Sequence, residues 1–184
     1  MNLSNIYPLA AEKSRESEAI RLDRVTQILL AKGIITPADI GLLIERKTDN
    51  SPMWRLLIEL DLVNADRVYR TAASAYGFEQ RELLSSSVCE RATELASKLS
   101  WSDWRALLDN GILPIGKNTT PAGRERIVFA SYDPSRHAVH RILHGFKNLS
   151  FELVFAERLA VTSLIPLVEM AVKNQLTGVV TRAA

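Results

Sequence analysis

Apolar residues recur in the same frame twice within the N-terminal half of the chain. The frame consists of two apolar residues, a tight reversal, another apolar residue, a helix cap, and then apolar residues four apart. Its two copies, 28 residues apart, are Leu29, Leu30, Gly33, Ile35, Ile40 and Ile44, and then Leu57, Ile58, Asp61, Val63, Val68 and Ala72. Each copy predicts a helical hairpin, which cannot bury its apolar face alone. Two such hairpins packed together predict an N-terminal helical bundle.

Cap residues mark where these helices begin and end. In the first copy Gly33 is suited to end a helix in a left-handed turn, and Thr36 is a suitable N-cap for the next helix, with Asp39 in its first turn. In the second copy Asn64 is the expected N-cap and Gly77 the expected end. Two further helices are predicted after the repeat, over residues 88–98 and 101–108.

After Gly111 the pattern changes to short runs of β-branched and aromatic residues, which favour strands. These runs are 112–115, 127–130 and 151–155. A helix capped by Asp133 is expected between the second and third strands, and a last helix is expected over 163–173 with Pro166 in its first turn. The order strand, strand, helix, strand, helix predicts a small α/β subdomain, so the fold class is α+β.

These elements divide the chain into four parts. A polar tail without helical period is expected over residues 1–18, and the helical subdomain with the tandem repeat is expected over 19–99. The α/β subdomain is expected over 100–174, and a second tail is expected over 175–184.

The composition is that of a soluble globular protein, with 47% apolar and 24% charged residues among 184. The net charge of +2 lacks the dense basic stripe of nucleic-acid-binding proteins, so no nucleic acid partner is expected. A single cysteine, Cys89, excludes an internal disulfide and fits a reducing compartment. Since neither a signal peptide nor an apolar run of about 20 residues is found, we expect a cytoplasmic protein that reaches the membrane only through a partner.

The three histidines, His137, His140 and His144, share one face of a predicted helix with Arg141. Zinc can bind such a face, but no fourth ligand with comparable spacing accompanies the histidines, and we predict no metal site. The apolar residues of this helix lie on its opposite side, which favours a solvated polar face here. His137, His140, Arg141 and His144 remain candidates for docking a partner.

Residues 111–118 have the spacing of a phosphate-binding P-loop as far as Lys117. Asn118 then replaces the Ser or Thr that binds Mg²⁺, and the stretch is apolar and strand-like instead of being a loop before a helix. No nucleophile, base and orienting group can be assembled from the other residues. We therefore predict that the chain is not an enzyme.

The tandem repeat followed by the α/β pattern resembles the N-terminal domain of type II secretion and type IV pilus assembly ATPases. The matching stretches, within about residues 20–173, are LLAKGIITPADI, LIELDLVNADRV, NGILPIG and VFASYDP. The resemblance implies that this region binds the cytoplasmic part of an inner-membrane platform protein. In the family the helical part often carries tandem motifs that bind cyclic di-GMP, each approximately Arg-Leu-Gly, two free positions, two aliphatics, two free positions and Gly.

The first copy keeps part of this nucleotide motif. Its matching residues, which are the candidate nucleotide-binding residues implied by the resemblance, are Arg24, Leu29, Leu30 and Gly33. Thr26 stands in place of the motif glycine, and a side chain there hinders close approach of the backbone to a phosphate or a purine.

The second copy departs further, because Pro52-Met53-Trp54 replaces Arg-Leu-Gly and Asp61 replaces the later glycine. Proline supplies neither the charge nor the planar fork with which arginine holds phosphate or guanine. We therefore expect no cofactor, and the departures argue against a full cyclic di-GMP site.

Taken with the resemblance, these observations predict a non-catalytic docking module of a secretion or pilus-assembly ATPase, with an inner-membrane platform protein as its partner. Two alternatives remain open. One is a cyclic di-GMP receptor with a degenerate motif, and the other is a regulatory domain associated with a glycosyltransferase or signalling protein.

Overall fold

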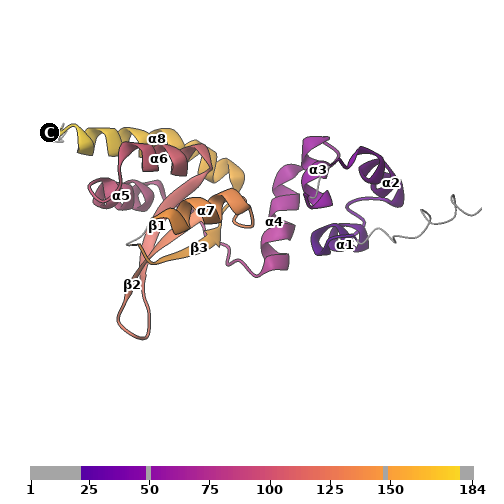
Figure 1. Ribbon diagram of the computed structural model, residues 1–184, viewed down its shortest axis with the longest axis horizontal. Coiled ribbons are helices and arrows are strands. Elements are labelled where there is room, and N and C mark those ends of the chain that lie inside the picture. Colours follow the sequence, from indigo (N-terminus) through magenta and orange to yellow (C-terminus); the bar gives the residue numbers. More distant parts are fainter. Residues whose placement is uncertain (1–21, 49–50, 147–148, 179–184) are drawn as a thin grey trace, which may run out of the picture.

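Eight helices and one three-stranded sheet make up the described residues, 22–48, 51–146 and 149–178, of this computed structural model (Figure 1). In chain order the elements are α1 (Arg24–Ala31), α2 (Pro37–Arg46), α3 (Met53–Glu59), α4 (Ala65–Tyr76), α5 (Ser85–Ala96), α6 (Trp101–Asp109), β1 (Ile112–Thr119), β2 (Glu125–Ser131), α7 (His137–Gly145), β3 (Phe151–Phe155) and α8 (Arg158–Leu176). The predicted α+β class, with a helical part first and a small α/β part after it, is confirmed. The tail predicted over 1–18 lies outside the described residues, and α8 extends into the start of the tail predicted over 175–184.

The tandem repeat is visible in the backbone hydrogen bonds that close each hairpin turn. In the first copy the Ile34 amide donates to the Leu29 carbonyl at 2.9 Å, and 28 residues later the Leu62 amide donates to the Leu57 carbonyl at 3.0 Å. These are the long bonds of a Schellman motif, which satisfy carbonyls left free at a helix end. Both copies therefore build the same α-hairpin turn.

A left-handed residue makes each of these turns possible. Gly33 has a φ of 63°, and Asp61 has a φ of 53° at the equivalent position of the second copy. Among the described residues Asp61 is the one non-glycine residue with positive φ. Aspartate tolerates this conformation better than most L residues do, so the turn persists although its glycine has been replaced.

The four helices of the two copies share one hydrophobic core. Thr36 and Asp39 form a capping box at the start of α2, and Asn64 caps α4, as the sequence predicted. With their starts fixed in this way, the helices direct their apolar residues toward one another. The buried members of this first core are Val25, Leu29, Ile35, Leu43, Met53, Trp54, Leu57, Val68, Ala72 and Ala75.

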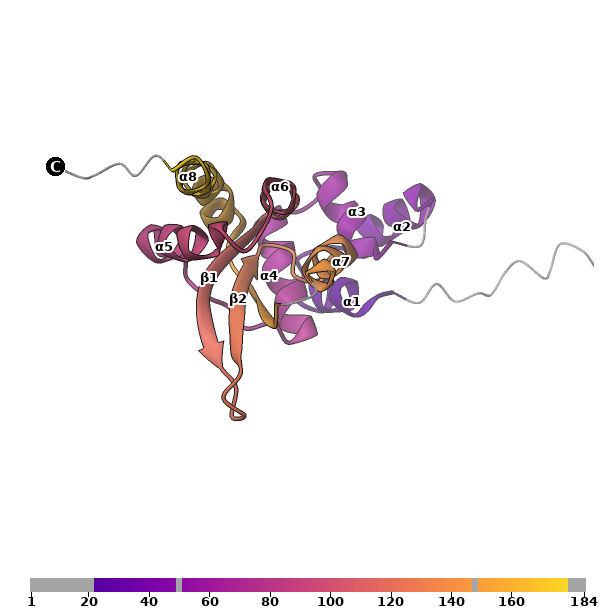
Figure 2. The ribbon, with the colours of Figure 1, turned by 60° about the vertical axis from the view of Figure 1, so that its left-hand side comes forward.

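The central strand of the sheet is β2. Strand β1 pairs with it in the antiparallel sense, and β3 pairs with it in the parallel sense. A parallel pair needs a crossover connection, and α7 supplies it between β2 and β3. The β1–β2 hairpin extends away from the body of the protein (Figure 2). The predicted order of strands and helices is thus confirmed.

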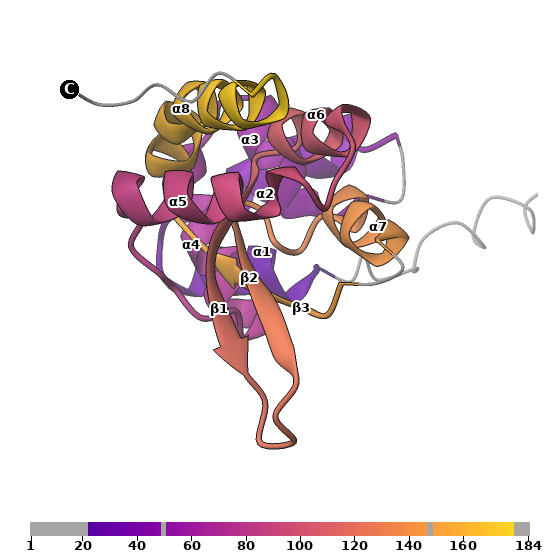
Figure 3. The same ribbon diagram turned by 90° about the vertical axis from the view of Figure 1, so that its left-hand side faces the viewer.

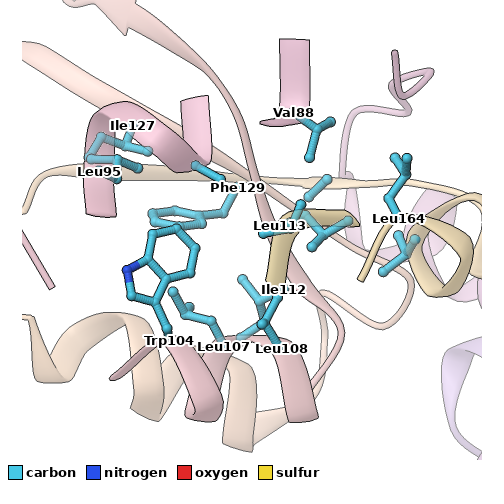
Figure 4. Packing of buried hydrophobic residues seen from close by; sticks show 14 of the residues in the cluster. Val88, Leu95, Trp104, Leu107, Leu108, Ile112, Leu113, Ile127, Phe129 and Leu164 are labelled. Atoms are coloured by element: carbon cyan, nitrogen blue, oxygen red, sulfur yellow. The ribbon is translucent and has the colours of Figure 1, made fainter. Parts of the chain in front are cut away.

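Helices α5, α6 and α8 gather over the sheet, and α7 lies beside them (Figure 3). Figure 4 shows Trp104 of α6 next to Phe129 of β2 in the second hydrophobic core. Helix α5 falls within the helical subdomain predicted over 19–99, yet its buried residues belong to this second core. These residues of α5 are Val88, Ala92, Leu95 and Ala96.

Helix α8 begins at Arg158, five residues before the predicted start at residue 163. Pro166 therefore lies inside the helix and not in its first turn, which corrects the expectation from sequence. Proline lacks the N–H that would bond to the Thr162 carbonyl, and burial of the inner side of α8 offsets this loss. The residues buried on that side are Val161, Leu164, Val168 and Val172. Within the part of the chain that the structure describes, every helix falls short of what a membrane span requires.

The helical part and the α/β part meet through polar and aromatic contacts, and the two hydrophobic cores have no residue in common. Arg70 of α4 pairs with Glu157 at 2.6 Å, and Arg158 of α8 pairs with Asp66 at 3.2 Å. Both pairs are solvent-exposed, so each contributes little to stability. A third, better buried pair at this junction belongs to the candidate site.

Candidate functional site

The starts of the two copies meet at the side chain of Asp23. Its carboxylate accepts a hydrogen bond from the Thr26 amide at 2.9 Å and another from the Thr26 hydroxyl at 2.8 Å. It also accepts a hydrogen bond at 2.8 Å from the amide of Met53, the first residue of α3. One carboxylate therefore accepts hydrogen bonds from the N-terminal ends of α1 and α3, which belong to different copies.

Trp54 occupies the position of the motif glycine in the second copy. Its side chain is fully buried in the first core, where its ring meets that of Tyr69 edge-on with centroids 6.1 Å apart. The guanidinium of Arg55 lies 4.4 Å from the centroid of the indole. Space that a glycine would leave open is thus filled by an aromatic side chain.

Arg55 extends from α3 to Asp133, which follows β2. The guanidinium donates to both carboxylate oxygens of Asp133, at 2.5 Å and 3.2 Å, and to the Ser135 hydroxyl at 3.4 Å. Asp133 is 3% exposed, so this bidentate, charge-assisted pair is largely shielded from water. The expectation that Asp133 caps the next helix is wrong, because its carboxylate pairs with Arg55 and α7 starts at His137 without a side-chain cap.

No signal in the sequence indicated that Arg55 belongs to this candidate site. It lies 78 residues from Asp133, and no local pattern marks two residues so far apart as partners. Tyr69 borders the pair, and burial raises the pKa of its phenol, with a further rise from the negative charge of Asp133. Tyr69 therefore stays neutral beside the pair at physiological pH.

Arg55 contributes to the lining of two cavities of about 340 Å³ each. In both of them the charge of Arg55 is balanced by Asp133, so neither cavity offers an unpaired Arg55 cation to an anionic ligand. One cavity is lined by Pro52, Trp54, Arg55, Tyr76, Phe78, Ser135 and His140. The other is lined by Arg55, Ile58, Glu59, Tyr69, Tyr132, Asp133 and Arg136.

The four residues that the resemblance offered for nucleotide binding do not form one exposed site. Leu29 is fully buried in the first core, and Leu30 is half-buried. Arg24 is exposed at the first position of α1, and Gly33 is exposed beyond its last turn. At about 1.5 Å per residue, the backbones of Arg24 and Gly33 are roughly 13 Å apart along the helix axis.

Comparison with known proteins finds solved structures of similar fold. No family model and no curated protein matches the chain. The structure of MshE with cyclic di-GMP is similar, with a TM-score of 0.53 and 15% sequence identity over 79% of this chain and 98% of that chain. The N-terminal domain of XpsE is similar with a TM-score of 0.50 and 19% identity, over 78% of this chain and 92% of that chain.

The chain has the fold of the N-terminal domain of secretion and pilus-assembly ATPases. The resemblance found in the sequence is thereby confirmed at the level of fold. With 15% and 19% identity, the likeness does not transfer binding residues from MshE or XpsE to this chain.

The starts of the two copies do not fit a bound cyclic dinucleotide. Thr26 is fully buried with its hydroxyl bonded to Asp23, and the indole of Trp54 fills the second copy. The carboxylate of Asp23 adds negative charge at this place, which repels phosphate groups. The absence of a full cyclic di-GMP site stays a prediction.

The predicted histidine face is only partly a solvated face. His137, Arg141 and His144 are exposed on α7, whereas His140 is half-buried. The His140 Nε2–H donates to the Pro134 carbonyl at 2.7 Å, so this ring helps to hold the loop before α7. No cluster of three or more potential metal ligands occurs within the described ranges.

The P-loop-like stretch is strand β1. Lys117 pairs with Glu125 at 3.0 Å and with Glu94 at 3.4 Å, and the hydrogen bond to Glu125 raises the pKa of Lys117. The Asn118 side chain donates to Glu152 at 2.8 Å. Both polar residues of the apparent motif are thus bound within the protein and do not form a loop that could surround a phosphate.

Helix α8 presents an apolar face to solvent. Leu159 is 76% exposed, Leu167 is 41% exposed and Met170 is 57% exposed. The exposed residues of α8 from Leu159 to Met170, called here the α8 face, are Leu159, Thr162, Ser163, Pro166, Leu167 and Met170. The one charged residue within this stretch is Glu169, which is 27% exposed and pairs with Lys173 and Arg105.

Proposed function

We propose that this chain is a non-catalytic docking module of a secretion or pilus-assembly ATPase, and that it binds the cytoplasmic part of an inner-membrane platform protein. The fold shared with MshE and with the N-terminal domain of XpsE supports this context. The observation that carries the docking role is the α8 face, an uncharged apolar strip on the outside of the α/β part. Exposed apolar side chains along one side of a helix favour an interaction site.

The dimensions of the α8 face favour a single helix of the partner. From Leu159 to Met170 the face is roughly 17 Å long, which corresponds to about three helical turns. A stable dimer buries roughly 800 Å² on each partner, and a strip one helix wide is far smaller than that. We therefore assign the face to an amphipathic helix of the platform protein, with an uncharged apolar stripe, and not to a second copy of this chain.

The exposed residues of α7 form the alternative docking surface. His137, Arg141 and His144 are polar or charged and solvated, so their burial would require polar partners on the other side. The α8 face exposes apolar area that association would remove from water, at roughly 25 cal/mol per Å². For this reason we favour α8 over α7.

The test is binding of the full chain to the purified cytoplasmic part of the platform protein encoded with it, measured by biolayer interferometry. Leu167→Asp combined with Met170→Asp places two charges in the α8 face and is expected to weaken binding at least 10-fold. The matched control, His137→Ala combined with His144→Ala, is expected to change affinity less than 3-fold. Unchanged circular dichroism melts would verify that both double variants are folded.

The possible outcomes distinguish the docking function itself from the choice of docking surface. If the native chain does not bind the platform protein, the docking function is refuted. If it binds but only the α7 variant loses affinity, docking stands and the surface is α7. The neighbouring genes also discriminate between the alternatives. If they encode polysaccharide synthesis and not a secretion platform, they favour a regulatory domain associated with a glycosyltransferase.

A further inference from the structure

Asp23 precedes α1 and reaches across to α3. The first amides of a helix have no partner inside the helix, so they need an acceptor from elsewhere. Pro52, which precedes α3, provides no side-chain cap. The Asp23 carboxylate supplies one from the other copy of the repeat, 30 residues away, at 2.8 Å from the Met53 amide nitrogen.

Two of the residues that donate to this carboxylate are buried, while Asp23 itself is half-buried. Thr26 is fully buried and Met53 is 4% exposed, so water cannot readily replace the hydrogen bonds that Asp23 accepts from them. A hydrogen bond to a charged acceptor in such an environment is stronger than its exposed counterpart, and loss of the acceptor leaves buried donors unpaired.

We propose that Asp23 is a built-in clamp between the two copies. Its carboxylate holds the start of α1 and the start of α3 together and fills the place beside both with a negative charge that belongs to the chain. The bundle is therefore complete without a bound anion, and the repeat acts as a permanently assembled scaffold. The clamp role of Asp23 does not depend on binding of the platform protein.

Asp39 provides a matched control for the clamp. Its carboxylate also accepts a backbone amide and a threonine hydroxyl, both from Thr36, at 2.7 Å and 2.8 Å. These bonds stay within the start of one helix, α2, and they are exposed. Both aspartates are half-buried, but the hydrogen bonds of Asp23 are better buried than those of Asp39, and Asp23 alone of the two bonds to Met53.

The experiment compares Asp23→Ala with Asp39→Ala in thermal unfolding and in amide hydrogen exchange of the full chain. Asp23→Ala is expected to lower Tm by about 5–10 °C, whereas Asp39→Ala is expected to lower it by about 2–3 °C. The Met53 amide should exchange at least 10-fold faster in Asp23→Ala and at the native rate in Asp39→Ala. Asp23→Asn, which keeps one acceptor oxygen, provides an intermediate variant if Asp23→Ala does not fold.

Two results would overturn the clamp. Equal Tm losses in the two alanine variants, with native exchange at Met53, would show that Asp23 is an ordinary cap. A saturable rise in Tm of the native chain on titration with cyclic di-GMP would show that the bundle is not complete without an anion. An unchanged Tm across that titration supports the clamp.

Discussion

At the scale of single residues, Trp54 decides what the start of the second copy can do. A fully buried indole, faced by Tyr69 and by the Arg55 guanidinium, occupies space that the nucleotide motif leaves empty. The indole Nε1–H has no hydrogen-bond partner, so Trp54 is held by packing and not by polar contacts. In this chain the position therefore belongs to the hydrophobic core.

Restoring the motif glycine should damage the fold. Trp54→Gly removes a fully buried aromatic side chain, and such truncations cost about 3–5 kcal/mol. Urea unfolding monitored by far-UV circular dichroism measures the loss. Tyr76→Ala is the control, because Tyr76 lines the same cavity yet is 44% exposed and should cost less than about 1 kcal/mol. A loss below about 1 kcal/mol for Trp54→Gly would contradict the packing role.

At the scale of elements, the repeat is a repeated hairpin turn more than a repeated sequence. The turn bonds from Ile34 to Leu29 and from Leu62 to Leu57 are equivalent, although glycine occupies one left-handed position and aspartate the other. Hydrogen bonds and apolar contacts of the hairpin compensate for the unfavourable φ of Asp61. The element thus tolerates a residue that its turn disfavours.

A reciprocal pair of substitutions tests this reading of the turn. Asp61→Gly should stabilise the protein by about 0.5–1 kcal/mol, because glycine adopts a positive φ without strain. Gly33→Ala should destabilise it by about 1 kcal/mol, and a Cβ at Gly33 meets no atom within 4 Å, so the cost comes from the backbone alone. Midpoints of urea unfolding would measure both effects. A loss of stability in Asp61→Gly would mean that its side chain has a role the structure does not reveal.

At the scale of the whole molecule, two hydrophobic cores are joined through ion pairs. The pair between Arg55 and Asp133 is the best buried of them, with side chains 22% and 4% exposed. Because the two cores share no residue, we expect this buried pair to couple the unfolding of the helical part to the unfolding of the α/β part.

Breaking this pair should uncouple the two cores. Arg55→Met leaves the Asp133 carboxylate buried and unpaired, which should cost about 3–5 kcal/mol. Fluorescence can follow each core separately, because Trp54 lies in the first core and Trp104 lies in the second, with Trp101 packed against it. A Trp54→Phe background reports on the α/β part, and a Trp101→Phe, Trp104→Phe background reports on the helical part.

In the native chain the two fluorescence transitions in urea should coincide, and in Arg55→Met they should separate. Arg67→Met is the control, since Arg67 is an exposed residue of α4 whose loss should change stability by less than about 0.5 kcal/mol. Coincident transitions in Arg55→Met would show that the cores are coupled by contacts other than this pair.

The sequence predicted the fold well where local signals decide it. Capping residues such as Thr36 and Asn64, the helix end at Gly33, and the three apolar strand runs all lie within a few residues of the elements they define. Local signals failed where a partner is distant. Asp133 has the local appearance of a cap, but its carboxylate is taken by Arg55, 78 residues away.

What the sequence determined by itself is the order of elements and the tandem hairpins, because helix periods, caps and turns are properties of neighbouring residues. Tertiary structure alone decided that Asp23 serves both copies, that His140 is held by the Pro134 carbonyl, and that α5 packs with the sheet. It also decided that the outer side of α8 stays exposed. Each of these depends on which surfaces meet after the chain has folded, and the spacing of residues along the chain does not encode that choice locally.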